Sequence, residues 1–126
     1  MEIRITLLLL FLFFTSCGIQ DGRPDGVFIR VQNNSDVNFT EVIVQSGNVE
    51  NGFGTVMARS NSKYKKFEYA FKYASVWLLA EGHQLNHNAS VKEGEIPLKA
   101  GYYTYRVGLN SANLTDASLV FNFVRD

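Results

Sequence analysis

The residue with the most distinctive chemistry in this chain is Cys17, its single cysteine. It follows an apolar run from Leu7 to Phe14 and two small residues, Thr15 and Ser16. The sulfur of a cysteine is nucleophilic as the thiolate and can be alkylated. The apolar run is shorter than the about 20 residues that a membrane-spanning helix needs, and with Arg4 before it, it has the form of a secretory signal. The pattern therefore predicts an export signal that ends at a modifiable cysteine.

The segment from Phe14 to Gly18 resembles the lipobox of bacterial lipoproteins, which has an apolar residue, two small residues and then cysteine. Phe14 stands where leucine is usual, whereas Ser16 and Gly18 match well. The resemblance implies that a diacylglyceryl group joins the Cys17 sulfur, that residues 1–16 leave as a signal peptide, and that the new amine is acylated, for example with palmitate. Two or more such chains hold a protein stably on a membrane. The alternative is an ordinary cleaved signal in which Cys17 has no role.

The residue after the cysteine bears on the location within the cell envelope. An aspartate directly after the lipidated cysteine resembles an inner-membrane retention signal, but this chain has Gly18 there. We therefore expect a lipid anchor in the outer membrane. The sequence does not predict whether the domain faces the periplasm or the outside of the cell. Residues 17–26 are then the lipidated cysteine and a flexible tether, because glycine, proline and aspartate dominate them. The remaining residues, 27–126, form the folded domain.

Two histidines, His83 and His87, are the residues that could begin a metal site. On a helix or on a strand they share one face, and Glu81 or Glu93 could complete the ligand set. The segment around them is rich in glycine and asparagine, which favours an exposed loop. We therefore expect no metal and no cofactor.

Residues for catalysis are equally sparse. The carboxylates are scattered, and no Gly-x-Ser-x-Gly nucleophile motif occurs. A glycosidase needs two carboxyl groups held about 5 to 9.5 Å apart across a cleft, and a small sandwich offers little cleft. The sequence favours a protein that is not an enzyme, with a small hydrolase as the least favoured alternative.

Charge and length limit the partners. Twelve Lys and Arg balance twelve Asp and Glu, and no basic stripe suggests a nucleic-acid partner. Once Cys17 is used, no cysteine remains for a disulfide, so the stability of the domain must come from its core. The length suits one domain.

In the residues that follow the tether, apolar side chains mostly recur at every second position. Residues 27–32 alternate as a strand with one buried face, and a polar turn follows. Phe39, Val42 and Val44 predict a second strand with a β-bulge between Phe39 and Val42, because the parity changes there. We expect residues 46–54 to be a loop and residues 53–57 a short strand.

The later part of the chain contains one ambiguous stretch. Residues 64–80 are too long for a single strand, so we predict a break near residues 70–72, with a helix over 65–74 as the alternative. A polar excursion over 83–95 with a short strand, a strand over 102–109 and a last strand around 119–123 follow. Seven to eight such strands predict an antiparallel β-sandwich of immunoglobulin-like or transthyretin-like type.

A polar turn and a set of mostly aromatic strand residues resemble those of a second group of proteins. These residues are Asn33-Asn34-Ser35, Phe39, Val42, Tyr64, Phe67, Tyr73 and Gly101-Tyr102-Tyr103-Thr104-Tyr105. They resemble the skeleton of small β-sandwich lipoproteins of Gram-negative bacteria, over nearly the whole mature chain. These motifs are structural, so no functional residue is implied by them.

The aromatic residues exceed what one face of each strand can hide. Core packing accounts for most of them, and the rest could form an exposed face for a glycan or a protein partner. Trp77, Tyr69 and Tyr102 are the candidates, since they lie opposite the expected core face or in the ambiguous stretch. The sequence thus favours a membrane-anchored binding or scaffolding module of the cell envelope. The alternative is a structural or accessory subunit of an envelope complex.

Overall fold

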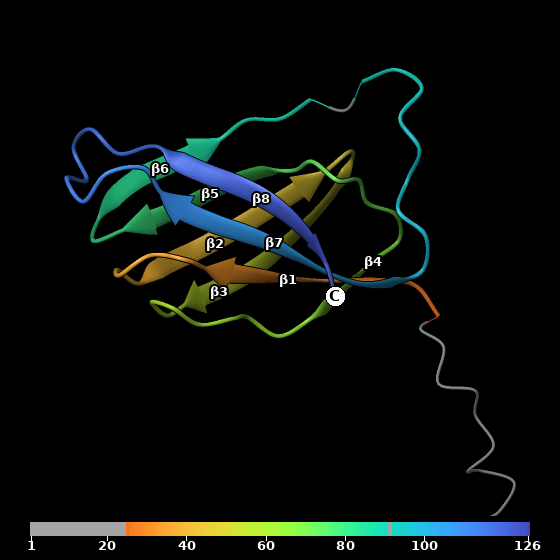
Figure 1. The fold of residues 1–126 in the computed structure, drawn as a ribbon, viewed down its shortest axis with the longest axis horizontal. Helices are drawn as coiled ribbons and strands as arrows, with labels where there is room; N and C mark the ends of the chain where they lie inside the picture. The colour runs from red at the N-terminus through yellow and green to blue at the C-terminus, as the bar shows by residue number, and fades with distance from the viewer. Residues whose placement is uncertain (1–24, 91) are drawn as a thin grey trace, which may run out of the picture.

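The computed structural model describes residues 25–90 and 92–126, which form eight strands and no helix. The strands make two four-stranded sheets, in the orders β4-β1-β7-β8 and β3-β2-β5-β6, packed face to face (Figure 1). This confirms the predicted all-β sandwich. The strands are β1 (Val27–Asn33), β2 (Phe39–Ser46), β3 (Val49–Val56), β4 (Lys65–Phe67), β5 (Ser75–Ala80), β6 (His83–His87), β7 (Gly101–Leu109) and β8 (Leu119–Arg125).

One strand pair departs from the antiparallel arrangement expected from the sequence. β1 and β7 run parallel, with Val27 opposite Gly101 and Asn33 opposite Val107, while the other pairs are antiparallel. Alternation of apolar residues shows which face a strand buries but not the direction of its neighbour. The parallel pair also needs a long crossover, and the whole second sheet lies within it.

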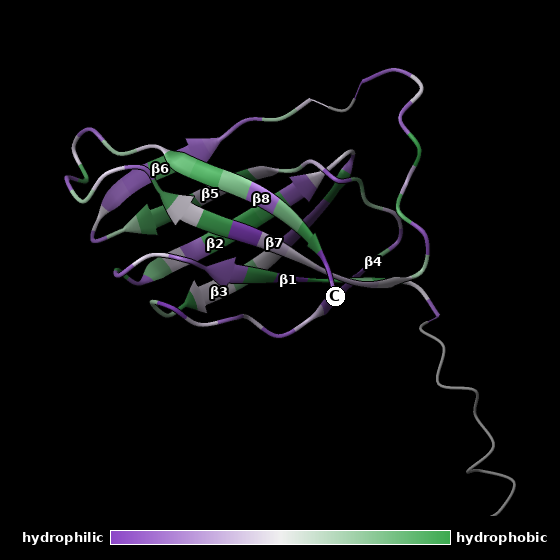
Figure 2. Cartoon of the chain, viewed as in Figure 1, coloured by the Kyte–Doolittle hydropathy of each residue, from purple (hydrophilic) through white to green (hydrophobic). Residues whose placement is uncertain are grey.

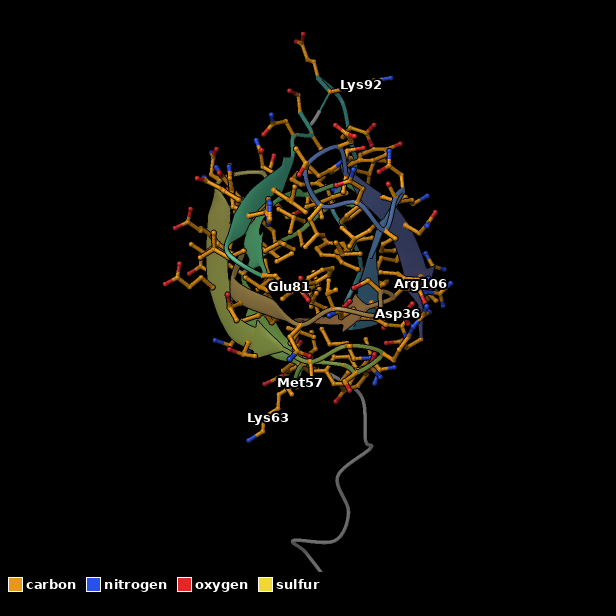
Figure 3. All side chains as sticks on the ribbon, turned by 90° about the vertical axis from the view of Figure 1, so that its left-hand side faces the viewer. Asp36, Met57, Lys63, Glu81, Lys92 and Arg106 are labelled. Atoms are coloured by element: carbon orange, nitrogen blue, oxygen red, sulfur yellow. The ribbon has the colours of Figure 1, made fainter. Side chains whose placement is uncertain are left out.

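The core lies between the sheets and is built from the alternate residues of each strand. Ile29 and Val31 of β1, Val44 of β2 and Val107 of β7 are all fully buried. Side chains fill the space between the two sheets (Figure 3), and hydrophobic residues concentrate on the strands while the connections are mostly hydrophilic (Figure 2). The period of two predicted these inward positions correctly.

The β-bulge in β2 is confirmed. The register with β3 shifts between Phe39 and Val42 and again between Val42 and Ile43, and Glu41 has a φ of 50°. The extra residue reverses the parity of the strand. As a result, both Phe39 and Val42 point into the core and are fully buried.

The prediction of a loop over residues 46–54 is wrong. Residues 47 and 48 form a tight hairpin turn, with Gly47 at a φ of 61°, and β3 begins already at Val49. β3 is an edge strand whose backbone pairs with β2, so its polar and glycine residues need not face a core. Lys65 donates a hydrogen bond to the Gly52 carbonyl at this edge.

The ambiguous stretch is broken where we predicted, and the helix alternative is wrong. β4 ends at Phe67, β5 begins at Ser75, and residues 68–74 are irregular. Buried hydroxyl groups fix this segment: Tyr105 donates to the Phe71 carbonyl at 2.5 Å and Ser46 donates to the Tyr73 carbonyl at 2.9 Å. Burial raises the pKa of Tyr105 to about 12.

A buried asparagine closes the opposite end of the sandwich. The Asn33 amide nitrogen donates to the carbonyls of Val37 at 2.7 Å and Val56 at 3.0 Å, and its oxygen accepts from the Ser35 hydroxyl at 2.6 Å. Asn33 is fully buried. It therefore ties the turn after β1 to the end of β3, satisfying carbonyl groups that would otherwise be buried without partners.

Candidate functional site

The outer face of the β4-β1-β7-β8 sheet carries neighbouring aromatic side chains. The strand register places Phe28 of β1 beside Tyr102 of β7 on one side and beside Lys66 of β4 on the other. The rings of Phe28 and Tyr102 stack with centroids 5.2 Å apart and planes at 22°. Tyr64, just before β4, meets Tyr102 edge to face, at 5.1 Å and 72°. We call Phe28, Tyr64 and Tyr102 the aromatic cluster.

A charged network runs beside the aromatic cluster. The Arg30 guanidinium lies 4.9 Å from the centre of the Tyr64 ring and donates to the Thr104 hydroxyl at 3.0 Å. The Thr104 hydroxyl in turn lies 2.7 Å from an oxygen of the Asp126 carboxylate, and Arg30 lies 3.7 Å from that same oxygen. These contacts hold two opposite, largely buried charges in place on the outer face of the sheet.

The same carboxylate orients Tyr64. The Tyr64 hydroxyl donates to Asp126 at 2.6 Å. Desolvation by burial, followed by the hydrogen bond to Asp126 and its negative charge, raises the pKa of Tyr64. The phenol therefore stays protonated and acts as a hydrogen-bond donor.

A hollow of about 430 Å³ opens next to the aromatic cluster, at the start of β7 and the end of β8. We call it the Tyr102 hollow. Phe28 stacks on the Tyr102 ring and Tyr64 meets it edge to face, and residue Tyr102 is still 43% exposed. A second hollow, of about 550 Å³, adjoins it and shares Lys99 and Arg125. The Tyr102 hollow is lined by Lys99, Ala100, Gly101, Tyr102, Tyr103, Arg125 and Asp126.

Backbone contacts make the Tyr102 hollow a fixed structure. The buried Tyr103 hydroxyl donates to the Lys99 carbonyl at 2.6 Å, and the Asp126 amide donates to the Tyr102 carbonyl at 3.0 Å. The Gly101 amide donates to the Gly26 carbonyl at 3.0 Å, so the chain enters β1 beside the hollow.

The three aromatic residues singled out from the sequence lie in separate places. Tyr102 belongs to the aromatic cluster. Trp77 is half-buried on the outer face of the other sheet, opposite Ile43 of β2, where it lines a hollow of about 220 Å³. Tyr69 lies in the irregular segment 68–74, with its ring edge-on to Phe71 at 6.1 Å. The structure does not bring these three side chains together.

Three residues of the site, Phe28, Arg30 and Asp126, were not among the candidates predicted from the sequence. Phe28 alternates with Val27 and Ile29, so an aromatic residue at an outward position was a readable signal that was passed over. Arg30 follows the same outward parity. The role of Asp126 had no local signal, because only the pairing of β8 with β7 brings it near β1.

The histidines do not form a metal site with their neighbours. His83 is exposed, and His87 stacks flat on Phe121 of β8, with ring centroids 5.2 Å apart and planes at 5°. Residues 25–90 and 92–126 contain no group of three histidine, cysteine or acidic side chains placed to hold a metal ion. His87 instead covers the seam between the two sheets.

The predicted signal peptide, residues 1–16, and the lipidation site, Cys17, lie outside the described residues. So does the tether, except for Asp25 and Gly26. In the part of the chain that the structure describes, no helix has the length and apolar character to cross a membrane.

The geometry defines a β-sandwich domain with an aromatic and charged outer face. No protein-family model and no curated protein sequence matches the chain. A solved structure, described as the NMR structure of the protein from Eubacterium rectale, is similar to it with a TM-score of 0.53 at 17% sequence identity. The similarity covers 82% of this chain and 94% of that chain. At this identity the likeness shows the fold alone.

Proposed function

We propose that this protein is a lipid-anchored, non-enzymatic binding module of the bacterial cell envelope, and that it binds glycans at the aromatic cluster and the Tyr102 hollow. The observation that carries the proposal is the exposed Tyr102 ring, which lines a hollow together with Lys99, Arg125 and Asp126. Large exposed aromatic rings beside polar groups are typical of binding surfaces.

The chemistry of the hollow suits a sugar. The C–H faces of a sugar ring are apolar and pack against an aromatic ring, while the hydroxyl groups at its rim need donors and acceptors. Asp126 supplies an acceptor, and Lys99 and Arg125 supply donors. Because β7 holds Tyr102 and the amide of Asp126 donates a hydrogen bond to the Tyr102 carbonyl, little ordering cost is added on binding.

The carboxylate in the hollow supports binding rather than hydrolysis. Asp126 accepts hydrogen bonds from Tyr64 and Thr104 and lies 3.7 Å from Arg30. Among the described residues that line the Tyr102 hollow, it is the one carboxylate, whereas a glycosidase needs two.

The lipid anchor is the second part of the proposal and rests on Cys17 and the apolar run before it. Cys17→Ser should abolish labelling by an alkyne fatty acid fed to the cells and release the protein from the membrane fraction. Tyr73→Ala, a change at an exposed residue outside the signal and the lipobox, is the control and should leave both unchanged. Labelling of the Cys17→Ser protein would show that the anchor lies elsewhere.

Glycan binding is tested by titrating the purified protein with a panel of oligosaccharides. Tyr102→Ala should weaken binding by about tenfold, the effect expected from losing one aromatic contact of about 1.5 kcal/mol. Tyr73→Ala is the matched control, since Tyr73 is 44% exposed and lies outside both hollows. Equal binding by the two variants would contradict the assignment of the site.

A structural or accessory subunit of an envelope complex is the second candidate function. The outer face of the β3-β2-β5-β6 sheet favours it, because Ile43 is 36% exposed next to Trp77. Capture of a specific envelope protein that is lost on Ile43→Ser, with no glycan bound, would support this candidate over the first.

A further inference from the structure

We propose that the Tyr102 hollow selects acidic saccharides, meaning sugars whose ring carries a carboxylate or a phosphate. This inference rests on the proposed glycan binding and specifies its ligand. The argument comes from how the charges at this end of the sandwich are paired.

The negative charge in the hollow is already balanced. Asp126 faces Arg30, and their side chains are only 21% and 29% exposed. Tyr64 and Thr104 also donate hydrogen bonds to this carboxylate. Asp126 therefore retains little negative charge with which to repel an anion, although its free lone pairs still accept from sugar hydroxyl groups.

The positive charges of the hollow are not balanced in this way. Among the described residues, neither Lys99 nor Arg125 forms an ion pair. The adjoining hollow adds Lys72 and Lys92 against two acidic residues, Glu93 and Glu95. Four cations thus line the two hollows together with three carboxylates, of which Asp126 is already paired with Arg30. This leaves an excess of positive charge around the hollows.

The two cations are attached to firmly held backbone. Arg125 is paired with Tyr103 across β7 and β8, and the Tyr103 hydroxyl holds the carbonyl of Lys99. A guanidinium binds a carboxylate or a phosphate through two parallel hydrogen bonds, and a lysine adds a point charge. A sugar bound in the Tyr102 hollow would then meet Lys99 and Arg125, which line the hollow together with Tyr102.

The test is calorimetric titration of the purified protein with four probes: trigalacturonate, its carboxyl-reduced neutral counterpart, galactose 6-phosphate and inorganic phosphate. We expect trigalacturonate to bind at least about tenfold more tightly than the neutral trisaccharide, which corresponds to one charge-assisted hydrogen-bonded contact. Galactose 6-phosphate against inorganic phosphate shows whether the sugar phosphate or the phosphate alone is recognised.

Variants separate charge from stacking. Lys99→Gln and Arg125→Gln should each weaken trigalacturonate binding by about fivefold and leave the neutral trisaccharide unchanged. Arg59→Gln is the matched control, because it removes one positive charge near Asp36, at the end of the sandwich where β1 finishes. Figure 3 shows Asp36 well apart from Lys92, a residue that lines the second hollow.

The outcomes distinguish this inference from the proposed function. Equal binding of the acidic and neutral trisaccharides would overturn the selectivity and leave glycan binding in place. No binding of any saccharide would overturn both. Binding of inorganic phosphate as tight as that of the sugars would show a general anion site and also overturn the inference.

Discussion

The two sheets of the sandwich bury similar rows of aliphatic side chains but present different outer faces. The outer face of β4-β1-β7-β8 carries three contacting aromatic rings and two of the three ion pairs found among the described residues, Arg30–Asp126 and Lys66–Asp25. The outer face of β3-β2-β5-β6 carries Trp77 and Ile43 beside the bare backbone of Gly52.

The difference between the two outer faces shows which surface side chains the fold does not require. Inward residues of both sheets are explained by burial alone, since apolar area removed from water stabilises either sheet equally. A linked set of rings, hydroxyl groups and opposite charges is not needed for solubility on an outer face. Its presence on one sheet only is the reason for assigning the binding site there.

The largest expected effect concerns the interior that both faces share. The pKa of Tyr105 is raised from 10.0 to about 12 by burial, so the folded state holds the proton where the unfolded state loses it. The stability from this group is complete below pH 10 and should fall by about 2 kcal/mol as the pH rises from 10 to 12. Urea unfolding of the wild type and of Tyr105→Phe across this range measures it.

Tyr105→Phe should lower the free energy of unfolding by about 1 to 2 kcal/mol at pH 7, because the Phe71 carbonyl loses its donor. In this variant, the free energy of unfolding should fall less between pH 10 and 12, because Tyr105 no longer contributes to that loss. An unchanged pH dependence would show that the buried Tyr105 hydroxyl is not the group that titrates. An unchanged free energy of unfolding at pH 7 would show that its hydrogen bond does not hold the irregular segment.

The next largest effect tests whether the two outer faces have separate roles. Trp77→Ala should lower stability by about 1 to 2 kcal/mol, because a half-buried indole loses apolar contact on the sheet, and should leave glycan affinity unchanged. Thermal unfolding and calorimetric titration of the same sample check both values. Weaker glycan binding by a folded Trp77→Ala protein would move the site to the other sheet.

The smallest effect is expected at Gly52. A methyl group at this position would meet no heavy atom within 4 Å. Gly52→Ala should therefore raise the free energy of unfolding by about 0.5 kcal/mol, because it restricts the unfolded chain, with no change in binding. A destabilised variant would show that a partner or a packing contact already occupies this outer face.

Much of the fold could be predicted from the alternation of apolar residues. That pattern identified the bulge between Phe39 and Val42, because the parity of the buried positions changes there. The length of residues 64–80 indicated the break near residues 70–72, which lies between β4 and β5. The alternation failed at β3, where an edge strand is held by backbone pairing and its Asn51 and Gly52 resemble a turn. The parallel pairing of β1 and β7 could not be predicted, because the alternation of apolar residues within a strand does not depend on the direction of its neighbour.

The candidate site could be predicted only in part. Tyr102 was identified because its parity opposes that of the buried Tyr103 and Tyr105. The same reasoning applied to β1 would have found Phe28. The contacts of Asp126 depend on strand order, and a sequence pattern with a period of two does not report which strands are neighbours.

The most direct test of the central claim is an amide chemical-shift titration of the ¹⁵N-labelled protein with trigalacturonate. We predict that the shifts cluster at Phe28, Lys99, Tyr102 and Asp126, while the Trp77 indole N–H and the amide of Ile43 stay unchanged. Shifts centred on Trp77 and Ile43, or no shifts at all, would contradict the account.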